Sequence, residues 1–506
     1  MSVVDANENE NDSQAPVAGR QFILFNAVPS WLVSAILHFL LVVLLAFWDL
    51  PGTDKTLVQI LTETSEQEEV EDVEDIELTP TNLPTFDASE SLESPITMDT
   101  EFSEQIEEME SFSEEPVDFS APTDALGISD LLANADTGVT AGGGPAFGRG
   151  EKGREQALKS GESTEDSEQA VVDALNWIVN HQLPDGGWSF DHTIGPGAFR
   201  RSTGAGSARN ARFGATAMAI LPLLGAGQTH LEGEEKYKNA IRRGLSYLIE
   251  NQKKIALPGG GVGGSFHEPD GNMYSHGLAT IALCEAYAMS LDRDLQYPAQ
   301  AAINFIVYAQ DDVTGGWLYQ PRSGGDTSVV GWQFMALKSG QMGFLNVPKR
   351  TIGKATQFLD GVQTESGSRY GYRGPGGGSS TTSIGLLCRM YLGWDKENPA
   401  LENGVEYLGG VGPSKNNMYY NYYATQVMRH YGGEPWKKWN GAMRDYVVGK
   451  QDKAGNSKGS WFFDHGWSKR GGRLYDTSMS CMILEVYYRH LPIYGSKAAE
   501  EEFALD

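Results

Sequence analysis

The sequence predicts an all-α domain in which six helical hairpins close into a double ring. Three observations lead to this prediction. One pattern, an amphipathic helix, a glycine-rich turn and an apolar helix, recurs six times between about residues 165 and 491. The two helices of each repeat differ in polarity. Three of the turns end in Gly-x-Trp. A repeat of this length indicates units that must stack to bury their apolar faces.

The first helix of each repeat has one apolar face. In residues 171–182, Val171, Ala174, Leu175 and Ile178 fall at the spacing of one helical face, which predicts a half-exposed helix. The same pattern predicts five further outer helices at about 237–252, 298–310, 349–363, 401–409 and 436–451.

The second helix of each repeat is apolar on nearly every side, as in residues 274–290. A helix of this kind is buried on both sides. Five more such helices are predicted at about 213–225, 327–342, 382–394, 417–431 and 477–490. We therefore expect six inner helices around an axis and six outer helices that face water.

The net charge of −28 belongs to the part of the chain that precedes the repeats. Between Lys55 and Arg149 there are 24 Asp and Glu residues and no Lys or Arg. Residues 149–506 contain 37 acidic and 37 basic residues, so the repeat domain is neutral. A neutral domain without a basic stripe does not support nucleic-acid binding.

A membrane span is predicted near the N-terminus. Residues 31–48 (WLVSAILHFLLVVLLAFW) are 18 residues without a formal charge, with Trp at each end. The length suits a transmembrane helix, and tryptophan suits the two interfaces. Because the long acidic segment that follows is easily translocated, we expect the N-terminus in the cytoplasm and the repeat domain on the periplasmic or extracytoplasmic side.

The predicted organisation follows from these features. Residues 56–148 are rich in Glu, Asp, Ser, Thr and Pro and cannot bury enough apolar surface to fold, so a disordered tether is expected. Within it, residues 102–119 could form a short docking segment. The predicted parts are a polar tail at 1–28, a transmembrane helix at 29–49, an acidic and Gly-rich disordered linker at 50–164, the repeat domain at 165–491 and a C-terminal tail at 492–506.

Two polar residues, Ser34 and His38, share one face of the predicted span. Polar groups inside a membrane are costly and often functional. A Ser-x-x-x-His pattern in a single N-terminal span, followed by a tether and a distal domain, resembles the anchor of TonB-type energy-transducing proteins. The resemblance implies that Ser34 and His38 face a proton-driven motor complex. The alternative is that the membrane merely tolerates both residues. The acidic tether departs from that family, whose tether is rich in Pro with Lys and Glu.

The turns resemble a known motif. Gln182 to Trp188, Gln310 to Trp317 and Gln451 to Trp461 look like the QW motifs of squalene and terpene cyclases and of the prenyltransferase and squalene oxidase repeat superfamily. The resemblance covers about residues 165–491 and implies an (α/α)6 toroid with a ligand cavity on its axis. Glycine after a helix permits a left-handed cap, and tryptophan can hold adjacent helices together. We expect these motif residues to be structural.

The chemistry of the related enzymes is not recognisable in this sequence. Class II terpene cyclases protonate their substrate with Asp-x-Asp-Asp, and the repeat domain has no such tetrad; Asp292-Arg-Asp294-Leu lacks the fourth carboxylate. Squalene cyclisation is therefore not expected, and whether the chain is an enzyme stays open. Prenyltransferase toroids hold zinc through Asp, Cys and His. No Asp-x-Cys pair is present, and each cysteine lies among apolar residues, so no metal or cofactor is predicted. The alternative is a zinc ion held by some of His276, Cys284, Asp326, Cys388, Asp476 and Cys481.

Polar and aromatic residues gather near the predicted starts of the inner helices, where a toroid opens to solvent. Two segments echo each other, because an Asp-Thr pair precedes a buried helix at Asp326 and again at Asp476. Each Asp could be an N-cap that accepts hydrogen bonds from free amides, or an acid–base or sugar-binding group. The catalytic candidates are Asp326, Asp464, His465 and Asp476, and the ligand-binding candidates are His276, Trp332, Tyr372, Tyr419 and Tyr475.

We expect a membrane-anchored toroid that binds a hydrophobic or extended ligand, such as an isoprenoid, a lipid, a peptide or a glycan. The alternatives are an isoprenoid- or lipid-modifying enzyme of the prenyltransferase–cyclase type and a glycan-active (α/α)6 enzyme. Expected partners are the membrane and a motor complex of the TonB-system type.

Overall fold

The computed structural model describes residues 149–489 except 196 and 259. The predicted polar tail, membrane span, Ser34, His38, C-terminal tail and nearly all of the linker lie outside the described residues. Among the described helices, none combines the length and the apolar character needed to cross a bilayer.

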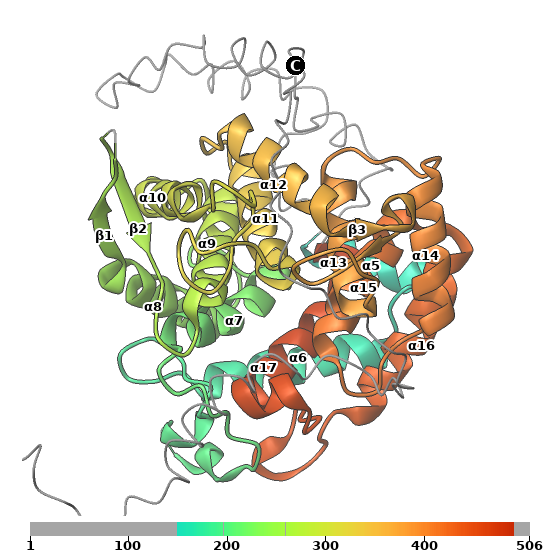
Figure 1. Cartoon of the computed structure of the whole chain (residues 1–506). Coiled ribbons are helices and arrows are strands. Elements are labelled where there is room, and N and C mark those ends of the chain that lie inside the picture. Colours follow the sequence, from blue (N-terminus) through green and yellow to red (C-terminus); the bar gives the residue numbers. More distant parts are fainter. Residues whose placement is uncertain (1–148, 196, 259, 490–506) are drawn as a thin grey trace, which may run out of the picture. The chain divides into compact units, whose positions relative to one another are not determined.

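Six inner helices form a closed ring (Figure 1). Each inner helix contacts the next one along the chain, and α17 contacts α7, so the ring closes on itself. Nearly every residue of these helices is buried, because each is covered by its neighbours in the ring and by an outer helix. The inner helices are α7 (Arg212–Gly225), α9 (Asn272–Ser290), α11 (Thr327–Met342), α13 (Ser379–Tyr391), α15 (Met418–Tyr431) and α17 (Gly466–Leu484).

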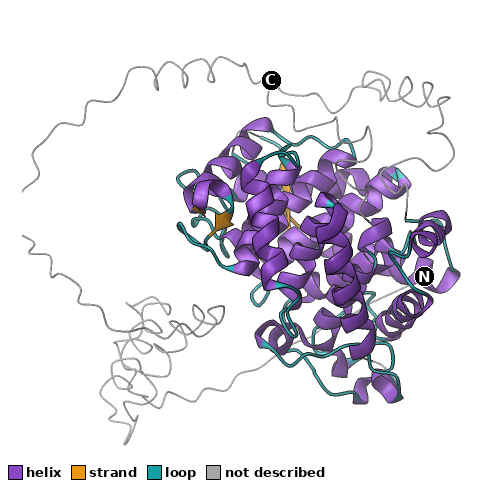
Figure 2. Ribbon diagram, turned by 90° about the vertical axis from the view of Figure 1, so that its right-hand side faces the viewer, coloured by secondary structure: helices purple, strands orange, loops and turns teal. Residues whose placement is uncertain are grey.

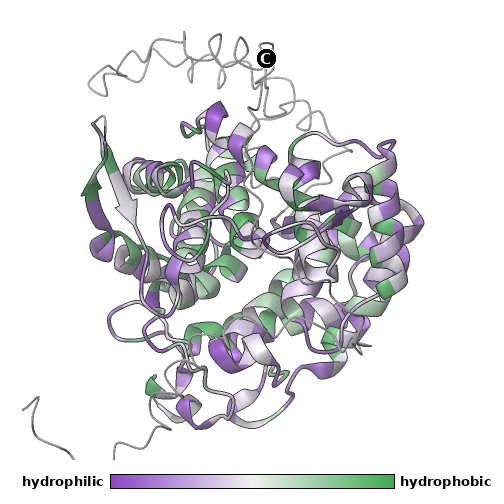
Figure 3. Cartoon of the chain, in the orientation of Figure 1, coloured by the Kyte–Doolittle hydropathy of each residue, from purple (hydrophilic) through white to green (hydrophobic). Residues whose placement is uncertain are grey.

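Six outer helices surround the ring, and each packs on the inner helices. They carry apolar residues on the inward side and polar residues on the outward side (Figure 3). The outer helices are α6 (Glu165–Asn180), α8 (Glu235–Asn251), α10 (Arg293–Ala309), α12 (Lys349–Val362), α14 (Pro399–Val411) and α16 (Gly433–Lys450). The all-α (α/α)6 double ring predicted from the sequence is thus the observed fold; Figure 2 shows it from the side.

Several elements were not predicted. A helix, α5 (Glu151–Ser160), lies inside the predicted disordered linker and packs against α18 (Val486–Arg489), with Ala157 in the core. The last inner helix begins at residue 466 rather than 477, because a short helical turn before the kink at Gly472 joins it. Two short antiparallel pairs also occur, β1 (Lys253–Ala256) with β2 (Val262–Ser265) and β3 (Gln363–Thr364) with β4 (Arg369–Tyr370).

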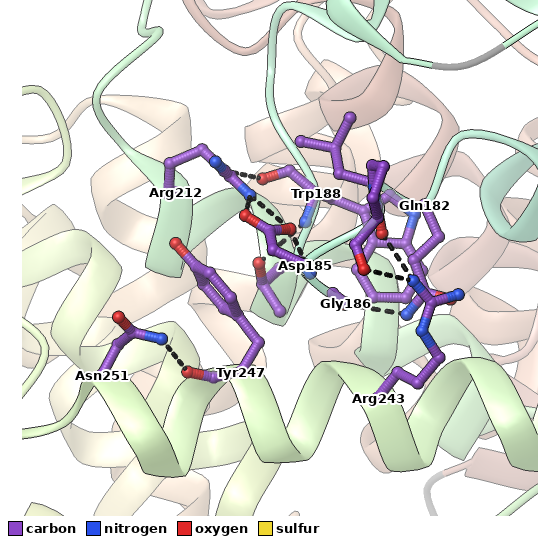
Figure 4. Close-up of polar contacts among 12 residues, drawn as sticks. Gln182, Asp185, Gly186, Trp188, Arg212, Arg243, Tyr247 and Asn251 are labelled. Atoms are coloured by element: carbon purple, nitrogen blue, oxygen red, sulfur yellow. Dashed lines mark hydrogen bonds and ion pairs between the residues drawn. The ribbon is translucent and has the colours of Figure 1, made fainter.

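The three predicted turns share one hydrogen-bond arrangement, and Figure 4 shows the first of them. Gln182 Nε2 donates to the carbonyl of Gly186 at 2.8 Å inside the turn and to the carbonyl of Ala240 in α8 at 2.9 Å. Trp188 Nε1 donates to the carbonyl of Ile178 at 2.8 Å. The glutamine therefore joins its own helix to the next outer helix, and the tryptophan pins the turn to the helix before it.

The other two predicted turns repeat these bonds. Gln310 bonds the carbonyls of Gly315 and Thr351, both at 2.8 Å, and Trp317 bonds the carbonyl of Ile306. Gln451 bonds the carbonyl of Ala170 at 2.7 Å and that of Gly459 at 3.1 Å, and Trp461 bonds the carbonyl of Val447. Each motif glutamine thus bonds its own turn and a neighbouring outer helix, and each motif tryptophan bonds the helix before the turn.

Candidate functional site

The starts of several inner helices meet at one end of the ring and form an aromatic rim. We define this rim by Tyr274, Tyr319, Tyr372, Tyr419 and Trp467. Tyr274 lies 6.0 Å from Tyr319 and 5.7 Å from Trp467 between ring centroids, and Tyr419 stacks on Trp467 at 6.0 Å. The five residues of the rim come from five different repeats, as expected of a site built on inner-helix starts.

Asp326 caps the inner helix α11 below the rim. Its Oδ1 accepts hydrogen bonds from Ser328 N at 2.7 Å, from Ser328 Oγ at 2.6 Å and from Val329 N at 3.4 Å. The carboxyl group is 0% exposed, and this burial raises its pKa, while the bonds from Ser328 lower it. Of the two alternatives left open by the sequence, this geometry is that of an N-cap.

Hydroxyl groups link Asp326 to the rim. Tyr274 Oη lies 2.5 Å from Ser328 Oγ, and Tyr419 Oη donates to the carbonyl of Ser328 at 2.8 Å. Tyr319 and Tyr372 hydrogen-bond to each other through their hydroxyl groups. The rim is thus a polar aromatic surface whose tyrosine hydroxyls are already placed for hydrogen bonding.

An arginine completes the outer edge of the rim. The guanidinium of Arg373 lies 5.8 Å from the ring centroid of Tyr319 and 5.4 Å from that of Tyr372. Burial, followed by the neighbouring Asp326 carboxylate, raises the pKa of Tyr372 well above its ordinary value. Tyr372 is therefore a neutral hydrogen-bonding group at physiological pH and is 39% exposed, so a ligand can reach it.

A second aromatic layer lies beneath the rim. Trp332 stacks on Tyr422 with a centroid distance of 5.5 Å and meets Tyr419 edge-on at 6.0 Å. Tyr423 lies 5.2 Å from Tyr419. Trp332, Tyr422 and Tyr423 are at most 2% exposed, so they support the rim from below. Tyr475 is 8% exposed, on α17, and is near enough to Tyr419 to contribute to its raised pKa.

Asp476 lies inside α17 and holds the segment that precedes it. Its Oδ2 accepts a hydrogen bond from Phe463 N at 2.9 Å, and its Oδ1 accepts one from Ser468 Oγ at 2.8 Å. It is not an N-cap, because its carboxylate accepts these bonds from residues that precede it and not from the amides that follow it. Burial raises its pKa to about 7, although the two hydrogen bonds and Arg473 lower it. The carboxyl is 0% exposed.

The remaining candidates are placed differently. Asp464 is exposed, and its backbone φ is +50°; His465 is half-buried at the start of α17. His276 lies in the core, where Nδ1 accepts a hydrogen bond from Phe266 N at 3.2 Å and Nε2 lies 3.2 Å from the carbonyl of Ala302. Burial lowers the pKa of His276 to about 3. A neutral ring with both nitrogens bonded to backbone supports a structural role for His276.

No cluster of three or more His, Cys, Asp or Glu that could hold a metal ion occurs in residues 149–489 as far as the structure describes them. Cys284, Cys388 and Cys481 are buried free thiols, and burial raises the pKa of each. Cys481 Sγ donates to Glu485 Oε1 at 3.5 Å.

Sequence reasoning missed three residues of the site, Tyr274, Tyr319 and Ser328. Tyr274 and Ser328 fall in the first turn of an inner helix, which is the same position as the predicted Tyr419. That position could have found them, because first-turn side chains of all inner helices face the same opening.

Comparison with known proteins agrees with the repeat resemblance. A family model described as the squalene-hopene cyclase C-terminal domain matches residues 153–260, which include the Gln182 turn. No curated protein matches this chain.

Solved structures are similar over about two thirds of the chain. An inactive variant of the α-1,6-mannanase GH76A of Salegentibacter sp. HEL1_6, in complex with α-1,6-mannotriose, is 12% identical. That alignment covers 64% of this chain and 99% of the mannanase, with a TM-score of 0.44. The type II terpene cyclase MstE from Scytonema, without ligand, is 11% identical. That alignment covers 64% of this chain and 97% of the cyclase, with a TM-score of 0.42.

Proposed function

We propose that the toroid is a binding module and that the aromatic rim holds an extended ligand with hydroxyl groups and flat apolar faces, such as a glycan. The observation that carries the proposal is the partly exposed aromatic rim over a network of hydroxyl groups. Aromatic faces provide apolar contact, and tyrosine hydroxyls provide hydrogen bonds at the same place.

Burial of the two central carboxylates supports binding rather than catalysis. Asp326 and Asp476 are each 0% exposed, and each accepts hydrogen bonds from backbone amides of its own neighbourhood. A carboxylate that attacks or protonates a substrate must lie within hydrogen-bond reach of it. In this arrangement, both carboxylates hold the site together.

A glycan-active enzyme is the second candidate, and one observation favours it. A carboxyl group whose pKa is about 7, as burial makes that of Asp476, is partly protonated near neutral pH and is suited to general acid catalysis. Catalysis would require the 463–468 segment to move away from Asp476.

An isoprenoid-modifying enzyme has support from the matched family model. Against it, the sequence lacks the Asp-x-Asp-Asp tetrad of that chemistry.

The anchor is part of the proposal. We infer from residues 31–48 that the chain spans the membrane once, with the toroid on the periplasmic or extracytoplasmic side. Ser34 and His38 would then contact a proton-driven motor complex of the TonB-system type. Co-purification of such a complex with the wild-type chain but not with the Ser34→Ala/His38→Ala variant would support this contact, and equal recovery would exclude it.

A glycan array probed with the full chain in detergent tests the binding proposal. We expect retention of oligosaccharides, with no change in their mass after prolonged incubation. Cleaved products would replace the binding proposal with the enzyme. If no glycan is retained while copurified lipid is found by native mass spectrometry, the ligand is an isoprenoid or a lipid.

A further inference from the structure

One exposed surface beside the rim is strongly basic. We define the basic lip by Arg200, Arg201, Arg209, Lys469 and Arg470, all of which are exposed. Residues 197–215 contain four arginines and no Asp or Glu, and residues 466–475 contain three basic residues and no acidic one.

The two stretches are held together by backbone hydrogen bonds. Ser207 N donates to the carbonyl of Lys469, Ala208 N donates to that of Arg470, both at 3.0 Å, and Arg473 N donates to that of Gly204 at 2.7 Å. The approach is close, because a Cβ on Gly206 would lie 2.5 Å from the Arg470 carbonyl oxygen. The basic lip is therefore a built surface in which the loop around Ser207 is joined to the first turns of α17.

Acidic groups neutralise part of this surface. Asp191 pairs with Arg209 at 3.0 Å and Asp452 pairs with Arg473. The Asp270 carboxylate accepts a hydrogen bond from Asn210 N at 2.9 Å, and the Asp270 carbonyl accepts one from Arg470. Asp464 is exposed on the segment before α17. Partly exposed aromatic side chains lie in the same segment, namely Phe462, Phe463 and Trp467. The lip thus offers positive charge next to aromatic surface.

We propose that the basic lip binds the chain's own acidic segment, residues 102–119. This segment, FSEQIEEMESFSEEPVDF, contains seven acidic residues, three phenylalanines and no basic residue. Its charge is opposite to that of the lip, and its phenylalanines match the aromatic side chains beside it. Positive and negative patches that match in this way favour specific association.

The connection is long enough for this contact. The folded domain begins at Arg149, which lies at the opposite end of the ring, near the end of α9, where it pairs with Glu285 at 2.8 Å. The inner helix α9 has 19 residues, or about 28 Å. A segment with the 29 residues of 120–148 can span at most about 100 Å. A tether of this length raises the local concentration of the segment to the millimolar range.

Carbodiimide crosslinking of the full chain, read by mass spectrometry, tests this proposal because it joins only amines and carboxylates in contact. We expect Lys469 to crosslink to acidic residues of 102–119 about fivefold more than the outer lysines Lys349 and Lys437, and 0.5 M salt to abolish the difference, since the Debye length falls to about 4 Å. The Arg200→Glu/Arg201→Glu variant should lose the excess, and the matched Lys437→Glu/Lys438→Glu variant should keep it.

Three results would overturn the proposal. One is equal crosslinking of Lys469 and the outer lysines. Another is an unchanged excess in the Arg200→Glu/Arg201→Glu variant whose thermal unfolding matches wild type. The third is crosslinking that joins only different copies in a mixture of isotopically labelled and unlabelled chains. None of these results bears on ligand binding by the aromatic rim, which is tested separately.

Discussion

The side-chain amide of Gln451 donates a hydrogen bond of 2.7 Å to the backbone carbonyl of Ala170, and this contact closes the outer ring. Gln451 follows the last outer helix, α16, and Ala170 lies in the first one, α6, so the bond joins the two ends of the repeat array. The same arrangement joins α6 to α8 and α10 to α12. Gln451 thus joins the last outer helix to the first one and closes the outer ring.

Replacing Gln451 with Leu should destabilise the domain. The substitution removes two buried hydrogen bonds and leaves the carbonyls of Ala170 and Gly459 without this donor. We expect a loss of about 2–4 kcal/mol in the free energy of unfolding, measured by urea denaturation. Gln169→Leu on the exposed face of α6 should change it by less than about 0.5 kcal/mol. Equal effects of the two substitutions would mean that ring closure contributes no stability.

The glycine two residues before each motif tryptophan should be irreplaceable. Gly459 has a φ of +89°, and a Cβ there would lie 2.3 Å from the carbonyl oxygen of Asp173. Gly459→Ala should therefore cost more than about 2 kcal/mol, since the left-handed conformation alone costs about 1–2 kcal/mol. On α16, Gly441 has nothing within 4 Å, so Gly441→Ala should stabilise the domain by about 0.5–1 kcal/mol. Thermal unfolding of both variants checks the contrast. An unchanged stability of Gly459→Ala, or a destabilised Gly441→Ala, would contradict the prediction.

Asp476 should make stability fall as pH rises. Burial raises its pKa to about 7 in the folded state from an ordinary 3.8, so between pH 4 and pH 7 the folded state binds more protons than the unfolded state. The free energy of unfolding therefore decreases over that window, by up to about 4 kcal/mol from this group.

Asp476→Asn has no titrating group at this position, and its amide can still bond Phe463 N and Ser468 Oγ. Unfolding measured from pH 4.5 to pH 8 should show wild type losing about 1–4 kcal/mol relative to this variant. The exposed Asp395→Asn serves as the control and should follow wild type. Parallel curves for wild type and Asp476→Asn would show that the carboxyl is ionised throughout.

Arg149, Glu285 and Arg489 should behave as one unit. Glu285 accepts hydrogen bonds from Arg149 at 2.8 Å and from Arg489 at 3.0 Å, and all three side chains are buried. Glu285→Gln leaves two buried guanidinium groups without their carboxylate and should cost about 3–5 kcal/mol. In a double-mutant cycle, Arg149→Met combined with Glu285→Gln should cost less than the sum of the single changes. Additive costs would mean that the contact is unimportant for α5 docking.

The ring was predictable because amphipathic helices indicate the outer layer and helices that are apolar on all sides indicate the inner layer. The two kinds of helix alternate along the whole repeat region. The fourth glutamine bond escaped prediction. Gln252 Nε2 donates to the carbonyl of Pro298 at 2.9 Å, and so joins α8 to α10. No Gly-x-Trp follows Gln252, because the strands β1 and β2 and Phe266 take the place of that turn. The hydrogen bond between consecutive outer helices is therefore present here, although the Gly-x-Trp that would predict it is absent.

The candidate site was predictable only in part. Tyr372 and Tyr419 were found because aromatic residues at inner-helix starts indicate an opening of the ring. The distinction between Asp326 and Asp476 was not, because the same Asp-Thr pair caps one helix and lies inside another. The difference lies in the hydrogen bonds, because Asp326 accepts from the amides that follow it, whereas Asp476 accepts from Phe463 N and Ser468 Oγ, which precede it. The spacing of residues in the sequence does not predict which hydrogen-bond donors each carboxylate contacts.

The most direct test of the central claim is the affinity of the full chain for its ligand after loss of one rim side chain. Trp467 and Trp394 are both partly buried tryptophans, one at the rim and the other just after the end of α13. With the best glycan from the array and calorimetry as the readout, Trp467→Ala should weaken binding by at least about tenfold, which corresponds to about 1.4 kcal/mol. Trp394→Ala should leave binding unchanged. Equal affinity of Trp467→Ala and wild type, with both folded, would place the ligand elsewhere on the toroid.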